Sequence, residues 1–320
     1  MYRLILRTAG AYNIAFGIWA ALWPQAFFDL FELDPPRHPQ IWACLGMVVG
    51  LYGLVYLLAA SRLETAKPLI AIGLAGKVLG PIGWAISVRS GEWPIRTFTL
   101  VSFNDLIWWM PFALFLLEGT RLGARLRGLA PFICAGTNAL AALALLLILK
   151  PGTEVEADLT RRAAYIAEHL LGWRAGWLLW YAAAATLLGF YAWWAARLPR
   201  QSIGIAAWCL AAVGIASDWT AESLYIGWLP AQLDSIQRLG TILTGGVANG
   251  LYSVAGAILT LATPNLPRSL LVLAWLTWVF GFGLSAAAFA GHVAGMVAAA
   301  AGLMPLFCLL ACRIGLQLRS

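Results

Sequence analysis

IWACLGMVVGLYGLVYLLAA, residues 41–60, is a continuous apolar run that contains no charged residue. A helix of about 20 apolar residues is what the hydrocarbon core of a bilayer requires. Hydrophobic residues make up 62% of this 320-residue chain and charged residues only 11%, whereas soluble domains carry roughly 25% charged residues. The run therefore predicts a transmembrane helix, and the composition excludes a water-soluble protein.

Nine other stretches of the chain repeat this pattern, so the fold class that we predict is all-α. The protein is expected to be a polytopic integral membrane protein with about ten transmembrane helices. These helices are expected near residues 5–23, 41–60, 68–88, 98–117, 130–149, 175–197, 203–226, 238–262, 269–290 and 293–313.

Charges in the connecting loops predict the orientation of the helices. Basic residues gather in alternate loops, and the loops between them carry most of the acidic residues. Because basic loops stay on the cytoplasmic side, both termini are expected to be cytoplasmic. The basic residues that give the chain its net charge of +7 lie next to apolar spans, where Lys and Arg contact anionic lipid headgroups. Membrane lipids are therefore the expected partners, and nucleic acid is not.

A basic segment at residues 119–129 divides the chain. Four expected helices precede it in a membrane domain at 1–118, and six follow it in a membrane domain at 130–320. We interpret residues 119–129 as a cytoplasmic linker. No internal repeat relates the two parts, so the sequence gives no support to an inverted-repeat transporter.

Residues 158–173, in the longest hydrophilic loop, are expected to form an extracytoplasmic amphipathic helix. Four apolar side chains share one face of such a helix: Leu159, Ala163, Ile166 and Leu170. Arg161, Arg162 and Glu168 point elsewhere. A helix of this kind is expected to lie flat on the outer membrane interface.

Residues 1–118 resemble a known family. The resemblance rests on ALWPQAFFDLFEL at 21–33, WACLGMVVGLYGLVYLLAA at 42–60, GLAGKVLGPIGW at 73–84 and FNDLIWWMPF at 103–112. These segments are similar to the DoxX-like four-helix membrane domains of bacteria. The resemblance implies a four-helix fold and a bacterial inner-membrane location. Some DoxX-like proteins are linked to quinone-coupled sulfur oxidation, but no residue here matches a catalytic residue for that reaction, so the resemblance implies no activity.

Lys77 and Asp105 are charged residues inside two neighbouring expected helices. Lys77 is about 13 Å deep from one side and Asp105 about 10 Å from the other, at 1.5 Å per residue. In a core of about 30 Å their heights differ by only ~6 Å, which a lysine side chain covers. We expect an intramembrane ion pair, which either locks the helices together or forms part of a ligand site.

Asn104, Asp105, Trp108 and Trp109 form a polar and aromatic stripe on one helix. Residues four apart share a helical face. An aromatic wall beside a buried carboxylate suits a flat or cationic ligand. We therefore include Lys77, Asn104, Asp105 and Trp108 among the candidate ligand-binding residues; the alternative is that the tryptophans pack at a helix or lipid boundary.

The segment SDWTAESLYIGW, residues 217–228, gives the strongest functional indication. Asp218, Glu222 and Tyr225 share one helical face. Two carboxylates so close in a low dielectric cannot both ionise freely, so one holds a proton or a cation lies between them. Asp218 and Glu222 are the candidate catalytic residues, as a general acid–base pair, and Tyr225 is a candidate ligand-binding residue.

The next helix supplies the remaining candidates. Arg238, at its outer start, is the expected partner of Glu222. The helix continues with small and polar residues, among them Asn249 and Tyr252, which allow close helix packing or leave space for a ligand. Arg238, Asn249 and Tyr252 are therefore candidate ligand-binding residues.

The sequence identifies no cofactor and predicts no metal site. The five cysteines lie inside expected spans as apolar packing residues. The three histidines, His38, His169 and His292, show no metal-ligand spacing. No phosphate-binding loop, serine-hydrolase elbow or zinc-protease motif occurs where its mechanism would need it.

These observations leave three functions open. The one we favour is a protein that binds or processes a small lipophilic molecule, such as a quinone, an isoprenoid or a lipid, in an outward-facing intramembrane cavity. The first alternative is a proton-coupled transporter that uses the same carboxylates as a relay. The second is an accessory or structural subunit with a membrane-protein partner. Whether the protein is an enzyme is left open.

Overall fold

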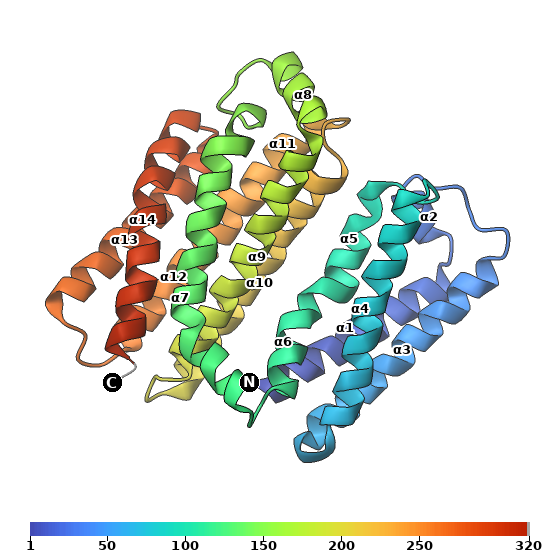
Figure 1. The fold of residues 1–320 in the computed structure, drawn as a ribbon, viewed down its shortest axis with the longest axis horizontal. Helices are drawn as coiled ribbons and strands as arrows, with labels where there is room; N and C mark the ends of the chain where they lie inside the picture. The colour runs from blue at the N-terminus through green and yellow to red at the C-terminus, as the bar shows by residue number, and fades with distance from the viewer. Residues whose placement is uncertain (319–320) are drawn as a thin grey trace. The chain divides into compact units, whose positions relative to one another are not determined.

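The computed structural model describes residues 1–318 and shows two compact units. Unit 1 comprises Met1–Gly123, and unit 2 begins at Ala124. All regular elements between residues 1 and 318 are helical (Figure 1). The predicted all-α class is therefore confirmed.

A helix is present at each of the ten predicted positions, and nine helices among the described residues are long and apolar enough to span a membrane. The exception is α1 (Tyr2–Leu22), which is 21 residues long. Arg7 and Asn13 lower its mean hydropathy. The architecture is that of a multi-pass membrane protein, which contacts membrane lipids through its apolar helices.

Unit 1 contains four long helical segments. They are α1; α3 (Pro39–Ser61); α4 (Lys67–Arg89); and a segment made of η2 (Ile95–Thr97), α5 (Phe98–Val101), η3 (Ser102–Leu106) and α6 (Ile107–Leu116). The shorter elements are α2 (Ala26–Leu30) and η1 (Leu63–Thr65). Helix α4 packs against η3 and α6, and the buried charged residues Lys77 and Asp105 lie at this contact.

Close approach of α1 and α3 depends on glycine. A Cβ on Gly17 would lie 2.6 Å from the carbonyl oxygen of Gly46 and 2.7 Å from backbone atoms of Gly50. Between transmembrane helices, where lipid is as apolar as leucine, small residues allow the backbone contact that stabilises packing. This contact holds the N-terminal helix α1 in unit 1.

Unit 2 is built from six long helical segments and two short helices at one end. The long segments are α7 (Arg121–Ala144) with η4 (Leu145–Leu149) and η5 (Lys150–Gly152); α9 (Leu170–Ala195); α10 (Gln201–Gly227); α11 (Leu233–Thr241) with η6 (Ile242–Ala248) and α12 (Asn249–Ala262); α13 (Arg268–Ala290); and α14 (Val293–Gln317). The two short helices at this end are α8 (Leu159–Glu168) and α11, which is also the first part of the α11–η6–α12 segment. They lie at the same end of the unit (Figure 1).

The long segments of unit 2 form a closed ring. Helix α10 packs between α9 and α12, and α13 packs between α12 and α14. Helix α7 completes the ring: the hydroxyls of Thr137 and Thr186 on α9 lie 2.6 Å apart, and Cys308 Sγ of α14 donates to the carbonyl of Ala135. This arrangement places α10 against two neighbours, so side chains in the middle of α10 are buried.

Two predicted segments differ in the structure. The segment at 119–129 is helical from Arg121 onward, because Thr120 Oγ1 accepts a hydrogen bond from the N–H of Gly123 at 3.0 Å and so caps α7. The amphipathic helix expected at 158–173 ends at Glu168, and α9 starts at Leu170. The apolar residues 170–173 therefore belong to the next span.

Candidate functional site

A buried ion pair joins two helices of unit 1. Lys77 Nζ lies 3.7 Å from Asp105 Oδ1, and the two residues are only 5% and 7% exposed. Lys77 Nζ also donates to Asn13 Oδ1 at 3.4 Å and to the carbonyl of Asn104. The predicted ion pair is therefore confirmed, and neutral acceptors share the lysine with it.

The backbone departs from a regular helix on both sides of this pair. Pro81 has no N–H, so the carbonyl of Lys77 loses its helical donor, and Trp109 Nε1 donates to it at 2.8 Å. Asp105 lies in the π-helical η3, a feature frequent at functional sites. A Cβ on Gly80 would lie 2.9 Å from Asp105 Oδ2, so this glycine makes room for the carboxylate.

The candidate ligand-binding residues of unit 1 lie close together, but they contact protein groups. Asn104 Nδ2 donates to Asp105 Oδ1 at 3.0 Å. Trp108 is 6% exposed and packs on Tyr12, with ring centroids 5.9 Å apart. Sequence reasoning missed Asn13, because one amide in an apolar helix does not indicate its partner. The arrangement supports the ion pair, and Trp108 is part of the core instead of an open aromatic wall.

The second cluster contains the two carboxylates of α10 in unit 2. Asp218 and Glu222 are 6% and 1% exposed. Tyr252 donates its hydroxyl to Asp218 Oδ2 at 3.0 Å, and the Thr244 side chain lies beside the same carboxylate. The other oxygens, Asp218 Oδ1 and Glu222 Oε2, have no hydrogen-bond partner within residues 1–318. The predicted pair of carboxylates is thus deeply buried, and only part of its hydrogen-bonding capacity is satisfied.

Arg238 does not neutralise this pair, so its predicted contact with Glu222 is wrong. Its guanidinium donates to the carbonyls of Ala288 and Phe289, both at 2.8 Å. These carbonyls belong to the last turn of α13, where carbonyls lack i+4 donors; that of Ala288 also accepts from the N–H of Gly291 at 3.2 Å. In the part of the chain that the structure describes, no Lys, Arg or His forms an ion pair with either carboxylate of α10.

The helix facing the acidic pair is irregular. The expected small and polar stretch at 242–248 is the π-helical η6. Ser217, next to the acids, donates to the carbonyl of Leu243 in it at 2.9 Å. Asn249, a predicted ligand residue, instead donates to the carbonyl of Gly281 at 2.7 Å and so joins α12 to α13. A π-helical turn thus occurs at both buried acidic clusters, and the third π-helical turn among the described residues, η4, is entirely apolar.

Polar side chains continue from the acidic pair to the end of unit 2 where α8 and α11 lie. Tyr225 is 2% exposed and donates its hydroxyl to the carbonyl of Gln237 at 3.4 Å. The Tyr225 ring packs against Gly240, next to Thr241 in α11. Thr241 in turn donates to Glu154 Oε2 at 3.1 Å. Glu154, which is half-buried, was not among the residues predicted from the sequence, because it lies in a loop distant from α10 along the chain; its contact required the tertiary fold.

Helix α8 buries a different face from the one expected. Ile166, expected on the face toward the membrane interface, is fully buried in the protein, whereas Leu159 is 44% exposed and Arg162 is 5% exposed. Arg162 Nε and Nη2 have no hydrogen-bond partner among the described residues. Burial lowers the pKa of Arg162 from its usual range, while the nearby Glu154 opposes that shift. The helix thus places a positive charge beside the polar end of the acidic cluster.

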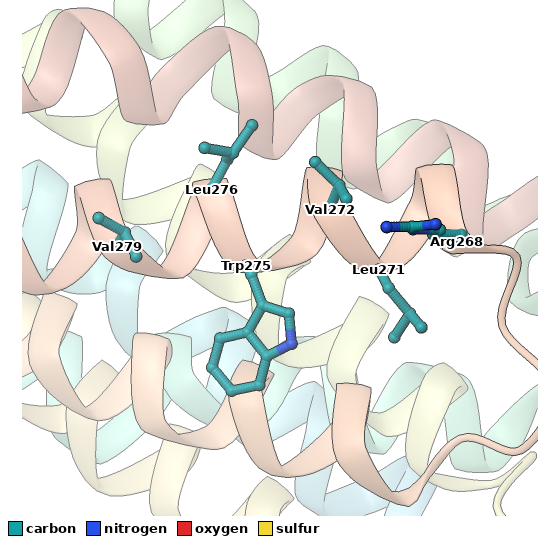
Figure 2. Close-up of a pocket in the computed structure, with 6 residues that line it drawn as sticks. All are labelled: Arg268, Leu271, Val272, Trp275, Leu276 and Val279. Atoms are coloured by element: carbon teal, nitrogen blue, oxygen red, sulfur yellow. The ribbon is translucent and has the colours of Figure 1, made fainter.

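The cavities found in unit 2 lie elsewhere. One is a shallow groove lined by six residues of α13, which Figure 2 shows: Arg268, Leu271, Val272, Trp275, Leu276 and Val279. Val272 and Val279 are more than half exposed, as expected of a lipid-facing surface. Neither this groove nor the second cavity, between the ends of α13 and α14, includes Asp218 or Glu222. The outward-facing cavity expected at the acidic pair is therefore not among them.

No protein-family model, curated protein or solved structure matches the chain.

Proposed function

We propose that the protein is a proton-coupled carrier of the bacterial inner membrane, with both termini cytoplasmic, and that Asp218 and Glu222 are its proton-binding site. One observation carries this proposal: two carboxylates lie one helical turn apart, at most 6% exposed, with no cationic partner among residues 1–318. Lys77 and Asp105 in unit 1 neutralise each other, so that cluster is less suited to binding a proton from water.

The charge of the buried carboxylates favours proton binding. An ionised carboxylate without a partner in a low dielectric is so unfavourable that the group takes up a proton instead. Two such groups in proximity repel, which favours sharing at least one proton. Ionisable residues of this kind inside membrane spans occur in the proton relays of pumps and transporters. The partly satisfied oxygens of the pair can accept a proton, or bind a cation after the proton has been released to water.

A second function keeps support from a specific observation. Aromatic pairs join α9 to α10 on the stretch of α10 that carries the acids: the ring centroids of Trp177 and Tyr225 are 4.4 Å apart, and those of Tyr181 and Trp219 are 4.6 Å apart. Aromatic side chains with a few polar groups are typical of sites for lipophilic molecules. Binding of a quinone, isoprenoid or lipid is therefore the second candidate, and it requires the site to open.

The test uses the purified protein in vesicles that enclose a pH-sensitive dye. After an external acid step with the membrane potential clamped, we expect proton uptake to fall at least tenfold in Asp218→Asn and in Glu222→Gln. Asp234→Asn, at an exposed carboxylate near the start of α11, is the matched control and should behave as the unmodified protein does.

Native mass spectrometry separates the two candidates. Uptake that is equal in all variants contradicts the proton-coupled carrier. A discrete bound mass that is lost in Asp218→Asn would then favour the lipophilic ligand.

A further inference from the structure

Two hollows meet at the first turn of α13, at the end of unit 2 opposite α11 (Figure 1). One is the shallow groove of Figure 2, which follows α13 from Arg268 to Val279. The other is a cavity of about 280 Å³ between the start of α13 and the end of α14. We infer that the two together bind an anionic phospholipid, with its phosphate in the cavity and an acyl chain along the groove.

The site carries positive charge that the protein does not neutralise. Arg313 of α14 lines the cavity, and Arg268 lines the adjoining end of the groove. Both side chains are exposed, and neither forms an ion pair or a hydrogen bond among residues 1–318. No Asp or Glu follows Asp234 in the sequence, so α13 and α14 contain no carboxylate side chain. The two guanidinium groups are therefore available to an anion from outside the protein.

The acidic residues of unit 2 lie toward its other end. Asp234 belongs to α11, and both carboxylates of α10 are nearer to the α11 end of that helix. Near the site, Arg197 Nε donates to the carbonyl of Leu318 at 3.2 Å, which adds a third basic side chain beside the end of α14. The loop charges predict that this end is cytoplasmic, and the cytoplasmic leaflet attracts basic groups through its anionic lipids.

The start of α13 offers a phosphate further hydrogen-bond donors. Pro267 is the N-cap residue and supplies no side-chain cap, so N–H groups of the first turn lack acceptors. The positive end of the helix dipole lies at the same place and favours an anion. The hydroxyl of Ser269 lines the cavity as well. Charge and hydrogen-bond donors thus converge beside Arg313.

The groove suits an acyl chain, which a free phosphate ion does not have. Figure 2 shows Arg268 at one end of a row of apolar side chains. From Arg268 to Val279 the helix rises about 16 Å at 1.5 Å per residue. The hydrocarbon of one leaflet is about half of a 30 Å core, so its thickness is close to this length. Val272 and Val279 are more than half exposed, and an acyl chain that contacts them covers apolar surface.

The experiment uses Trp275, which lines the groove and is 40% exposed, as its reporter. Full-length protein is placed in phosphatidylcholine vesicles with a small fraction of lipid brominated on its acyl chains, either phosphatidylglycerol or phosphatidylcholine. Bromine quenches tryptophan on contact, and the fluorescence that Trp275→Phe removes is the signal of the groove. We expect brominated phosphatidylglycerol to quench this signal at a lower fraction, by about fivefold for each guanidinium group.

The double variant Arg268→Gln/Arg313→Gln should abolish this preference for phosphatidylglycerol. Arg200→Gln is the matched control, because Arg200 is an exposed arginine before α10, and α12 lies between α10 and α13; its preference should be unchanged. If the double variant folds poorly, Arg268→Gln alone should reduce the preference about fivefold.

Equal quenching by the two brominated lipids in the unmodified protein would overturn the inference, and so would a preference that persists without the arginines. Proton uptake is not measured in this experiment, so its outcome leaves the proposed carrier function unaffected.

Discussion

The ion pair in unit 1 gives a prediction whose size follows from the structure. Lys77→Met and Asp105→Asn each remove one member of a pair that is 3.7 Å apart and at most 7% exposed. At such a separation and an effective dielectric of about 20, the attraction is about 4 kcal/mol. Loss of one partner from a buried pair destabilises a protein by about 3–5 kcal/mol, because the other charge is left uncompensated.

Neutralising both residues leaves no stranded charge. The double variant is therefore expected to lose less stability than either single variant, with a coupling energy of at least about 2 kcal/mol. The free energy of unfolding of unit 1 is measured in mixed micelles by titrating a denaturing detergent. Exchange of the α4 backbone amides, followed by mass spectrometry, reports on this unit.

Lys67 provides the matched control. It lies at the first position of the same helix and donates to the carbonyl of Glu118 at 2.7 Å, about 15 Å along the helix from Lys77. Lys67→Met combined with Asp105→Asn should be additive within about 0.5 kcal/mol. If Lys77→Met and Asp105→Asn are equally additive, the reasoning about a coupled buried pair is refuted.

Two further predictions concern the other contacts. Gly17→Ala should destabilise unit 1 by about 1–3 kcal/mol, since its Cβ would meet the backbone of Gly46 at 2.6 Å. Gly76→Ala is the control: it has open space around it and should cost nothing measurable in the same detergent titration. Equal effects of the two variants would show that α1 and α3 do not pack as described. Tyr252→Phe removes the donor to Asp218 Oδ2 and should lower the free energy of unfolding of unit 2 by about 1–3 kcal/mol. This loss should disappear when Asp218→Asn is already present.

Much of the fold could be predicted because it depends on local composition. A run such as 41–60 must be helical in a bilayer, since every backbone donor and acceptor has to be satisfied within the segment. The same reasoning placed the other long helices, although α7, expected from residue 130, starts at Arg121. This reasoning did not extend to α8, where the spacing of apolar residues alone could not decide whether Arg162 or Leu159 faces the protein.

The candidate sites divide in the same way. Spacing along one helix placed Asp218 and Glu222 on a common face, and depth in the membrane brought Lys77 level with Asp105. Neither argument could find a partner on a distant element, so Glu154 was missed and Arg238 was given the wrong one.

The sequence by itself determined that this is a helical membrane protein and which charges lie inside its spans, because burial of long apolar runs and the energy of a charge in hydrocarbon depend on residue type and position along one helix. Only the tertiary structure decided how those charges are compensated. A hydrogen bond or ion pair requires a few ångströms between specific atoms, and that distance depends on how helices far apart in the sequence pack. Lys77 is neutralised in this way, whereas the carboxylates of α10 are not.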